Sequence, residues 1–174
     1  MYEQVTPILQ GVEVEVHGKK VTASGPKGKL EKHFPLRDVT IVKEDSKIKV
    51  KSSSEKKHDK ALVGTTAAHI RNMILGVMKG YTYRLRVVFS HFPITVKVEK
   101  DKVIVQNFIG ERKPRIANIV GKSEVKLQEQ DITVTGLDID EVSQTAANLE
   151  QSTRISGYDK KIFQDGIWIT SKGE

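Results

Sequence analysis

The stretch DIDEVSQTAANLEQSTRISGYDKKIFQDGIWI, residues 138–169, combines one predicted helix with a basic tail. Val142, Ala146 and Leu149 recur at the spacing of one face of an α-helix. A helix with one apolar face needs a sheet on which to bury it. The predicted helix spans about 138–154.

The part of the chain before Gly80 shows a similar pattern with strands in front of the helix. Two predicted β-hairpins, at 12–23 and 39–51, have apolar residues at alternate positions. From 54 to 79 the period becomes helical, and Gly80 is predicted to end this helix. Its apolar stripe consists of Val63, Ala67, Ile70, Ile74 and Val77.

Both predicted helices carry terminal signals. Ser52 with Glu55, and Asp138 with Glu141, have the spacing of a capping box, in which side chains satisfy free backbone N–H groups. Gly157 is suited to the left-handed conformation that often follows a last helical turn.

The strand and helix pattern begins again after Gly80, so the chain is predicted to be an internal duplication. The segment YTYRLRVVFSHF, residues 81–92, alternates as a strand. Matching positions are 82, 84 or 79 residues apart: Val14 and Val96, Val21 and Val103, Gly28 and Gly110, Ile48 and Ile132, and Thr66 and Thr145.

We therefore predict an α+β protein of two duplicated domains, residues 1–81 and 82–174. Each domain is expected to be a small antiparallel β-sheet packed on one face by an α-helix.

The composition limits the classes of function that this protein can have. The 174 residues carry a net charge of +7, which favours a polyanionic partner such as nucleic acid. The absence of cysteine excludes disulfides and thiol chemistry. The five histidines have no metal-binding spacing, and the longest apolar runs fall far short of about 18 residues. We expect a cytoplasmic protein with no catalytic site, metal, cofactor or membrane contact.

Two glycine-containing basic loops are candidate phosphate contacts. GPKGK at 25–29 lacks the spacing of a nucleotide-binding loop, and an ordinary solvated loop is its alternative. IGERKPR at 109–115 occupies the equivalent place in the second copy and concentrates Arg112, Lys113 and Arg115 around a proline.

The basic tail contains the only tryptophan, and two interpretations of Trp168 remain open. It can close the core of the second domain, or it can stack on a base or ribose if its side of the strand is open. Asp165-Gly166 is a turn signal that is expected to bring Phe163 towards Trp168.

The segment VSQTAANLEQSTR followed by KKIFQDGIWI resembles the carboxyl end of the large-subunit ribosomal protein six family, in its archaeal and eukaryotic form. The resemblance extends over essentially the whole chain. It implies a structural protein of the ribosome, near the stalk base and the sarcin-ricin region. It also implies neighbouring ribosomal proteins, translation factors nearby, and a monomer within the ribosome.

Net charge and the resemblance point to different domains. Residues 1–80 hold 15 Lys and Arg against 9 Asp and Glu, whereas residues 81–174 hold 14 against 13. The resemblance implies that the carboxyl-terminal domain makes the main rRNA contacts, and we follow it because net charge averages over faces. The alternative is a free-standing RNA-binding module or assembly factor with the same fold. The expected rRNA contacts are Arg112, Lys113, Arg115, Arg154, Lys160, Lys161, Gln164, Gly166, Trp168 and Lys172.

Overall fold

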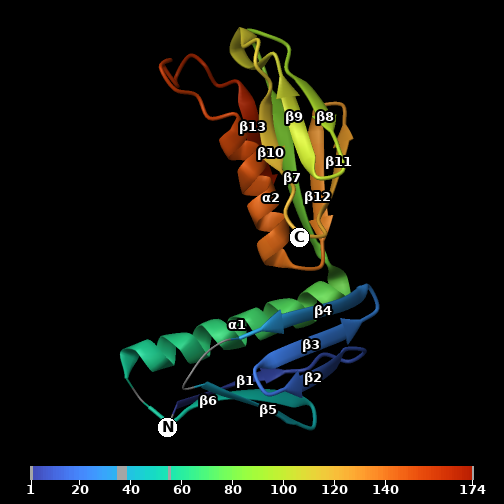
Figure 1. Cartoon of the computed structure of the whole chain (residues 1–174), viewed down its shortest axis with the longest axis vertical. Helices are drawn as coiled ribbons and strands as arrows, with labels where there is room; N and C mark the ends of the chain where they lie inside the picture. The colour runs from blue at the N-terminus through green and yellow to red at the C-terminus, as the bar shows by residue number, and fades with distance from the viewer. Residues whose placement is uncertain (1, 35–38, 55, 174) are drawn as a thin grey trace. The chain divides into compact units, whose positions relative to one another are not determined.

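The structure is a computed structural model that describes residues 2–34, 39–54 and 56–173. The chain divides into two compact units, residues 1–80 and 81–174. Each unit combines antiparallel sheets with one long helix, so the predicted α+β class is confirmed (Figure 1). Each contains two sheets, however, where the sequence predicted one.

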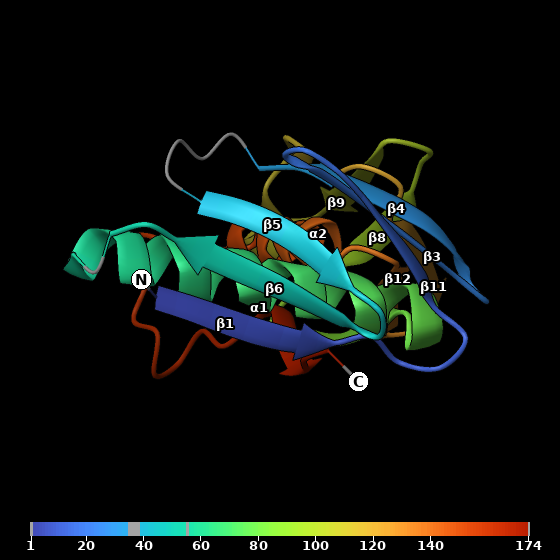
Figure 2. The same ribbon diagram turned by 90° about the horizontal axis from the view of Figure 1, so that it is seen from below.

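In the first unit two three-stranded sheets contact the helix α1, Lys57–Lys79. Figure 2 shows the strands of one sheet side by side across α1. That sheet has the order β1 (Tyr2–Pro7), β6 (Lys47–Ser52), β5 (Val39–Glu44). The other has the order β2 (Glu13–His17), β3 (Lys20–Gly25), β4 (Gly28–His33).

The second unit repeats this arrangement and adds one strand. Its helix α2, Ile139–Ser152, contacts both sheets. The three-stranded sheet has the order β10 (Arg115–Asn118), β9 (Lys102–Gln106), β8 (Thr95–Val98), and a 3-10 turn at Phe108–Gly110 precedes β10. The four-stranded sheet has the order β11 (Glu124–Gln128), β12 (Asp131–Gly136), β7 (Tyr81–Val88), β13 (Gly166–Ser171).

Strand pairing shows where the duplication holds and where it changes. The predicted equivalences hold in both hairpins, since Val16 pairs with Val21 as Val98 pairs with Val103. The proposed equivalence of Gly28 and Gly110 is wrong. Leu30 pairs with Ala23 as Arg115 pairs with Val105, which moves the separation from 82 to 85 residues. The second copy therefore has three extra residues in the loop before β10.

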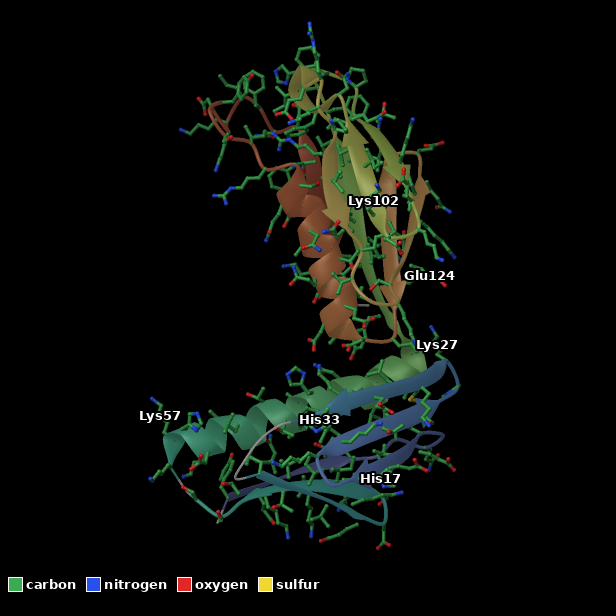
Figure 3. The ribbon with its side chains drawn as sticks, viewed as in Figure 1. His17, Lys27, His33, Lys57, Lys102 and Glu124 are labelled. Atoms are coloured by element: carbon green, nitrogen blue, oxygen red, sulfur yellow. The ribbon has the colours of Figure 1, made fainter. Side chains whose placement is uncertain are left out.

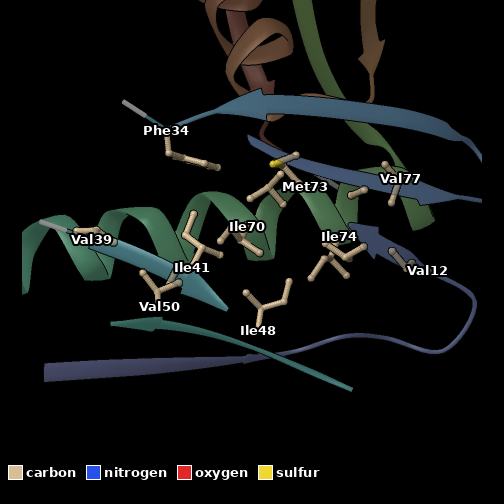
Figure 4. Packing of buried hydrophobic residues seen from close by; sticks show 14 of the residues in the cluster. Val12, Phe34, Val39, Ile41, Ile48, Val50, Ile70, Met73, Ile74 and Val77 are labelled. Carbon is tan, nitrogen blue, oxygen red and sulfur yellow. The ribbon is translucent and has the colours of Figure 1, made fainter. Parts of the chain in front are cut away.

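The predicted helical stripes form the cores of the two units. In α1 every residue of the stripe is buried, and Ile70 and Ile74 face Ile48 and Val50 of β6 (Figure 4). Val142, Ala146 and Leu149 of α2 are likewise completely buried. The alternation of β6 explains its two faces, because Lys49 and Lys51 lie between the apolar residues and pair with Glu44 and Glu3.

The helix ends differ in part from the prediction. Gly80 does end α1, at φ 75°, and its N–H donates to the Gly76 carbonyl at 2.8 Å. The residue before the first turn of α1 is Lys56, whose side chain makes no capping bond, whereas Glu55 of the predicted Ser52 box lies outside the described residues.

The predicted capping box of α2 does not form. Asp138 accepts from the Asp140 N–H at 2.9 Å, but Glu141 accepts from the backbone of Lys122 instead of returning to Asp138. The helix also ends at Thr153, before Gly157, because Thr153 is buried and holds the next strand.

Candidate nucleic-acid interface

The loop between β9 and β10 is anchored where it begins and exposed where it ends. Asn107 adopts a left-handed conformation at φ 59° and donates its amide to a carbonyl of the preceding loop at 3.0 Å. The ring of Phe108 is buried beneath the loop. Arg112 and Lys113 follow on this anchored base and are both exposed, as expected for phosphate contacts.

Arg115 connects this loop to the end of α2. Its Nε and Nη2 donate to the two carboxylate oxygens of Glu111 at 2.8 and 2.6 Å, and the guanidinium lies 4.3 Å from the centre of the Phe108 ring. Its Nη1 donates to the carbonyls of Ser152 and Arg154 at 3.0 and 2.9 Å. These bonds use four of the five N–H donors of an arginine. Arg115 therefore has a structural role, and we leave it out of the proposed rRNA contacts.

The tail between α2 and β13 forms a turn that projects beside this loop. The Asp159 carboxylate accepts from the Lys161 N–H at 2.9 Å, and its carbonyl accepts from the Phe163 N–H at 2.9 Å. Arg154, Lys160 and Lys161 are exposed. We call the surface formed by residues 111–114 and 154–164 the basic tip. In Figure 3 the labelled Lys102 and Glu124 lie along the strands, away from the side chains that project at this end.

Asp165 fastens the far end of the tail. Its carboxylate is buried and accepts from the backbone N–H groups of Ser90 and His91 at 3.1 and 3.2 Å. It also contacts the Ser90 hydroxyl at 3.2 Å and His91 Nδ1 at 2.9 Å. Burial alone would raise the pKa of Asp165, but these hydrogen bonds outweigh it and lower the pKa to about 2. The predicted turn at Asp165-Gly166 is thus an anchor to the loop after β7, not a hairpin.

The cluster of Ser90, His91 and Asp165 contains the residue types of a hydrolytic triad but not its geometry. In a triad the serine and the carboxylate contact opposite nitrogens of the imidazole. Here the Ser90 hydroxyl and the Asp165 carboxylate both lie at Nδ1, at 3.1 and 2.9 Å. The imidazole therefore cannot relay a proton between the Ser90 hydroxyl and the Asp165 carboxylate. The cluster instead clamps the loop after β7 to the start of β13.

Trp168 lies on the open side of β13. Its neighbour Ile167 is 1% exposed, whereas Trp168 is 48% exposed and donates its Nε1 to the Gln164 carbonyl at 3.1 Å. The interpretation of Trp168 as a core residue is therefore wrong, because the strand turns Ile167 inwards. Gly166 is buried and packs against Thr153 Oγ1, so we also leave Gly166 out of the proposed contacts.

A hollow of about 670 Å³ separates Trp168 from the end of α2, and we call it the α2–β13 hollow. Its walls are largely apolar, with Arg154 and Lys160 beside them. Sequence reasoning brought Phe163 and Trp168 together but did not find this hollow. No local sequence pattern predicts the hollow, because its walls come from β7, α2, the tail and β13. The lining residues are Val88, Glu150, Gln151, Thr153, Arg154, Ile155, Lys160, Phe163, Gln164, Ile167 and Trp168.

Acidic side chains at the basic tip are engaged within the protein. The hydrogen bond from Arg115 holds the pKa of Glu111 below its usual value, although partial desolvation acts in the opposite direction. Asp159 and Asp165 are bonded as described above. Within the described parts of the chain, no carboxylate forms an ion pair with the five cations Arg112, Lys113, Arg154, Lys160 and Lys161.

Two other basic segments are not among the residues of the basic tip. Lys172 is exposed at the opposite end of β13, where Ser171 pairs with Arg84. In the first unit the GPKGK turn is tied to α1, since the Lys27 N–H donates to the Val77 carbonyl at 3.0 Å. A side chain at Gly25 would overlap that same carbonyl, so packing on α1 shapes the backbone of this turn, while the side chains of Lys27 and Lys29 are exposed.

Among residues 2–34, 39–54 and 56–173, no three His, Cys, Asp or Glu side chains are grouped so as to hold a metal ion. Over those same residues, no helix combines the length and the apolar character needed to cross a bilayer.

These features define a duplicated α+β protein with a cationic and aromatic surface on its second unit. The family model described as ribosomal protein L6 matches residues 8–80 and 92–166, which places one match in each unit. The chain belongs to the ribosomal protein L6 family, and the resemblance predicted from the tail is confirmed. Since that family is a structural component of the cytoplasmic ribosome, the chain is not an enzyme.

Relatives that match nearly the whole chain carry the name large ribosomal subunit protein uL6, and three of them show the degree of similarity. The protein of Methanothrix thermoacetophila is 51% identical over 165 residues, covering 95% of this chain and 94% of that one. That of Desulfurococcus amylolyticus is 50% identical, with 96% and 92% covered. That of Staphylothermus marinus is 46% identical, with 100% and 96% covered.

Proposed function

We propose that this chain is a structural constituent of the large ribosomal subunit and binds large-subunit rRNA through the basic tip. The observation that carries the proposal is the bonding of Arg115 to the Ser152 and Arg154 carbonyls. This link brings the exposed cations of two distant segments onto one surface. Lysine and arginine that lack carboxylate partners are the groups that neutralise RNA phosphates.

The proposed contacts have two roles. The cations hold the phosphate backbone, and the exposed ring of Trp168 offers a stacking surface for a base. Gln164 is exposed and adds amide donors and an acceptor beside that ring. The proposed contact set is Arg112, Lys113, Arg154, Lys160, Lys161, Gln164 and Trp168. Lys172 lies at the other end of β13 and would contact rRNA separately from this set.

Family resemblance supports the further proposal that the protein lies near the stalk base and the sarcin-ricin region. It would act there as a single copy among other large-subunit proteins, with translation factors nearby. The names of the relatives support the large-subunit assignment.

Two triple variants of equal charge test the RNA contact. Arg112→Ala/Lys113→Ala/Lys161→Ala removes cations of the basic tip, and Lys47→Ala/Lys49→Ala/Lys51→Ala removes three from β6. Binding to large-subunit rRNA fragments is measured across a salt series. Each lost phosphate contact should lower the slope of log affinity against log salt by about 0.7 to 0.9. We expect this lower slope in the first variant and little change of slope in the second, because Lys49 and Lys51 already pair with Glu44 and Glu3.

Equal weakening by both triples would mean that affinity follows net charge, and the assignment to the basic tip would fail. Sedimentation separates the ribosomal proposal from a free-standing RNA-binding module or assembly factor. A structural constituent stays with large subunits through a high-salt wash, whereas loss at moderate salt would favour the alternative.

A further inference from the structure

We infer that the α2–β13 hollow accepts the base of one unstacked RNA nucleotide, and that it favours bases carrying an exocyclic amino group over uracil. This inference rests on the proposed RNA binding and names the chemical group that enters the hollow beside the basic tip. A volume of about 670 Å³ is ample for a nucleobase and falls in the usual range of small-molecule sites.

The aromatic walls of the hollow are held in place before any ligand arrives. The Trp168 indole is fixed by its bond to the Gln164 carbonyl, yet nearly half of its surface is exposed. The Phe163 ring stacks on His91 with 4.3 Å between ring centres, and Asp165 holds His91. A preformed aromatic surface suits a base, because stacking needs a flat ring and loses less entropy when that ring is already ordered.

Cations beside the hollow suit the charge of a nucleotide. Arg154 and Lys160 both line it, and in the described residues neither forms an ion pair with a carboxylate. A nucleotide whose base enters the apolar interior keeps its phosphates outside, within reach of these two side chains. An apolar protein side chain would fill the interior but leave both charges unused, so the observations favour RNA.

Glu150 provides the preference among bases. Its Oε1 accepts from the Ile169 N–H at 3.2 Å, and no other hydrogen bond to this carboxylate occurs among the described residues. An ionised carboxylate only accepts, so the second oxygen of Glu150 can take a donor from a base that enters the hollow. Cytosine offers an amino group there, as carboxylates recognise in nucleic acids. Uracil has a carbonyl oxygen at the equivalent place, which the carboxylate repels.

The single tryptophan makes the inference measurable in the full chain, because tryptophan emission comes from Trp168 alone. The probes are three hexaribonucleotides of equal charge: hexacytidylate, hexauridylate and an abasic hexamer. We expect hexacytidylate to quench the emission saturably and to bind about fivefold or more tightly than hexauridylate. The abasic hexamer should bind only through its phosphates and leave the emission unchanged. Glu150→Gln keeps an acceptor for Ile169 but removes the charge, and should reduce the preference for cytosine to less than about twofold.

Unchanged Trp168 emission with hexacytidylate, or equal affinity for the abasic hexamer, would overturn the inference. The proposed rRNA binding would survive that result if the salt slopes of the triple variants still differed. Quenching that requires a large-subunit protein fraction instead of RNA would assign the hollow to a protein side chain and also overturn it. Retention of the full cytosine preference in Glu150→Gln would overturn the base preference that the inference derives from Glu150.

Discussion

Thr66 and Thr145 make the same hydrogen bond in the two helices. Each hydroxyl donates at 2.8 Å to the carbonyl four residues earlier, that of Leu62 and that of Glu141, and both threonines are buried. The duplication therefore extends to a buried polar side chain as well as to the apolar pattern. The second copy has one further hydrogen bond, because Thr145 Oγ1 also accepts from the Val120 N–H at 3.0 Å.

Replacing one core residue in each unit should destabilise that unit. Ile70 and Leu149 are both completely buried on the inner faces of their helices. Ile70→Ala and Leu149→Ala should each lower the free energy of unfolding by about 2 to 5 kcal/mol. Trp168 emission reports only on the second unit, so only Leu149→Ala should shift the unfolding transition seen by fluorescence. Hydrogen exchange measures the unfolding free energy of the first unit. A loss below about 1 kcal/mol in that free energy for Ile70→Ala would contradict the assignment of the core face.

Arg115→Lys should weaken the basic tip even though it keeps the charge. A lysine cannot reproduce the paired bonds to Glu111 and the two carbonyl contacts of the guanidinium. We expect a loss of about 1 to 3 kcal/mol in the unfolding free energy of the second unit. Arg112→Lys is the matched control at an exposed position and should change stability by less than about 0.5 kcal/mol. Weaker RNA binding by Arg115→Lys at full stability would instead make Arg115 a direct contact.

The Asp165 clamp should make stability depend on pH in the acid range. Its folded pKa of about 2 lies below the ordinary value of 3.8. The clamp is therefore at full strength above about pH 4, and its contribution is lost as the pH falls towards 2. That contribution is about 2 kcal/mol. Asp165→Asn should cost this amount at neutral pH and flatten the acid part of the stability curve. The exposed Asp101→Asn is the control, and an equal flattening there would contradict the assignment.

Gly121→Ala should be more harmful than the strain of its backbone alone. Gly121 lies at φ 60°, and an added methyl group would overlap the Glu141 carboxylate, which accepts from the Lys122 N–H at 2.9 Å. Gly157 lies at φ 81° with open space around it, so Gly157→Ala reports the cost of the left-handed conformation only, about 1 to 2 kcal/mol. Calorimetry should show an additional loss of about 1 kcal/mol or more for Gly121→Ala. Equal losses would mean that Glu141 moves away at no cost.

Local periodicity explains which elements were predicted and which were not. The helices and the central hairpins were found because one face of each is buried, so apolar residues recur at a fixed spacing. The strands β1, β4 and β10 were not predicted, and only Thr6 of β1 is buried. Their alternation is weak: Leu30 is only half-buried and Ile116 is 55% exposed. The predicted single sheet per domain is two because the hairpins do not pair with each other: β2 and β3 pair with β4, whereas β5 and β6 pair with β1.

The duplication, the two core faces, the α+β class and the basic character of the tail were predictable from residue order, because each depends on residues that are neighbours along a helix or strand. Which of the charged side chains are free to bind a partner depends on the packing of distant segments. Arg112 and Arg115 look equivalent in the sequence, yet Arg115 is bonded to segments 37 and 39 residues away while Arg112 is exposed. Likewise, Asp165 meets His91 74 residues away, and Ile167 turns inwards to leave Trp168 open. Such contacts depend on how the strands pack, and a pattern with a period of a few residues does not record them.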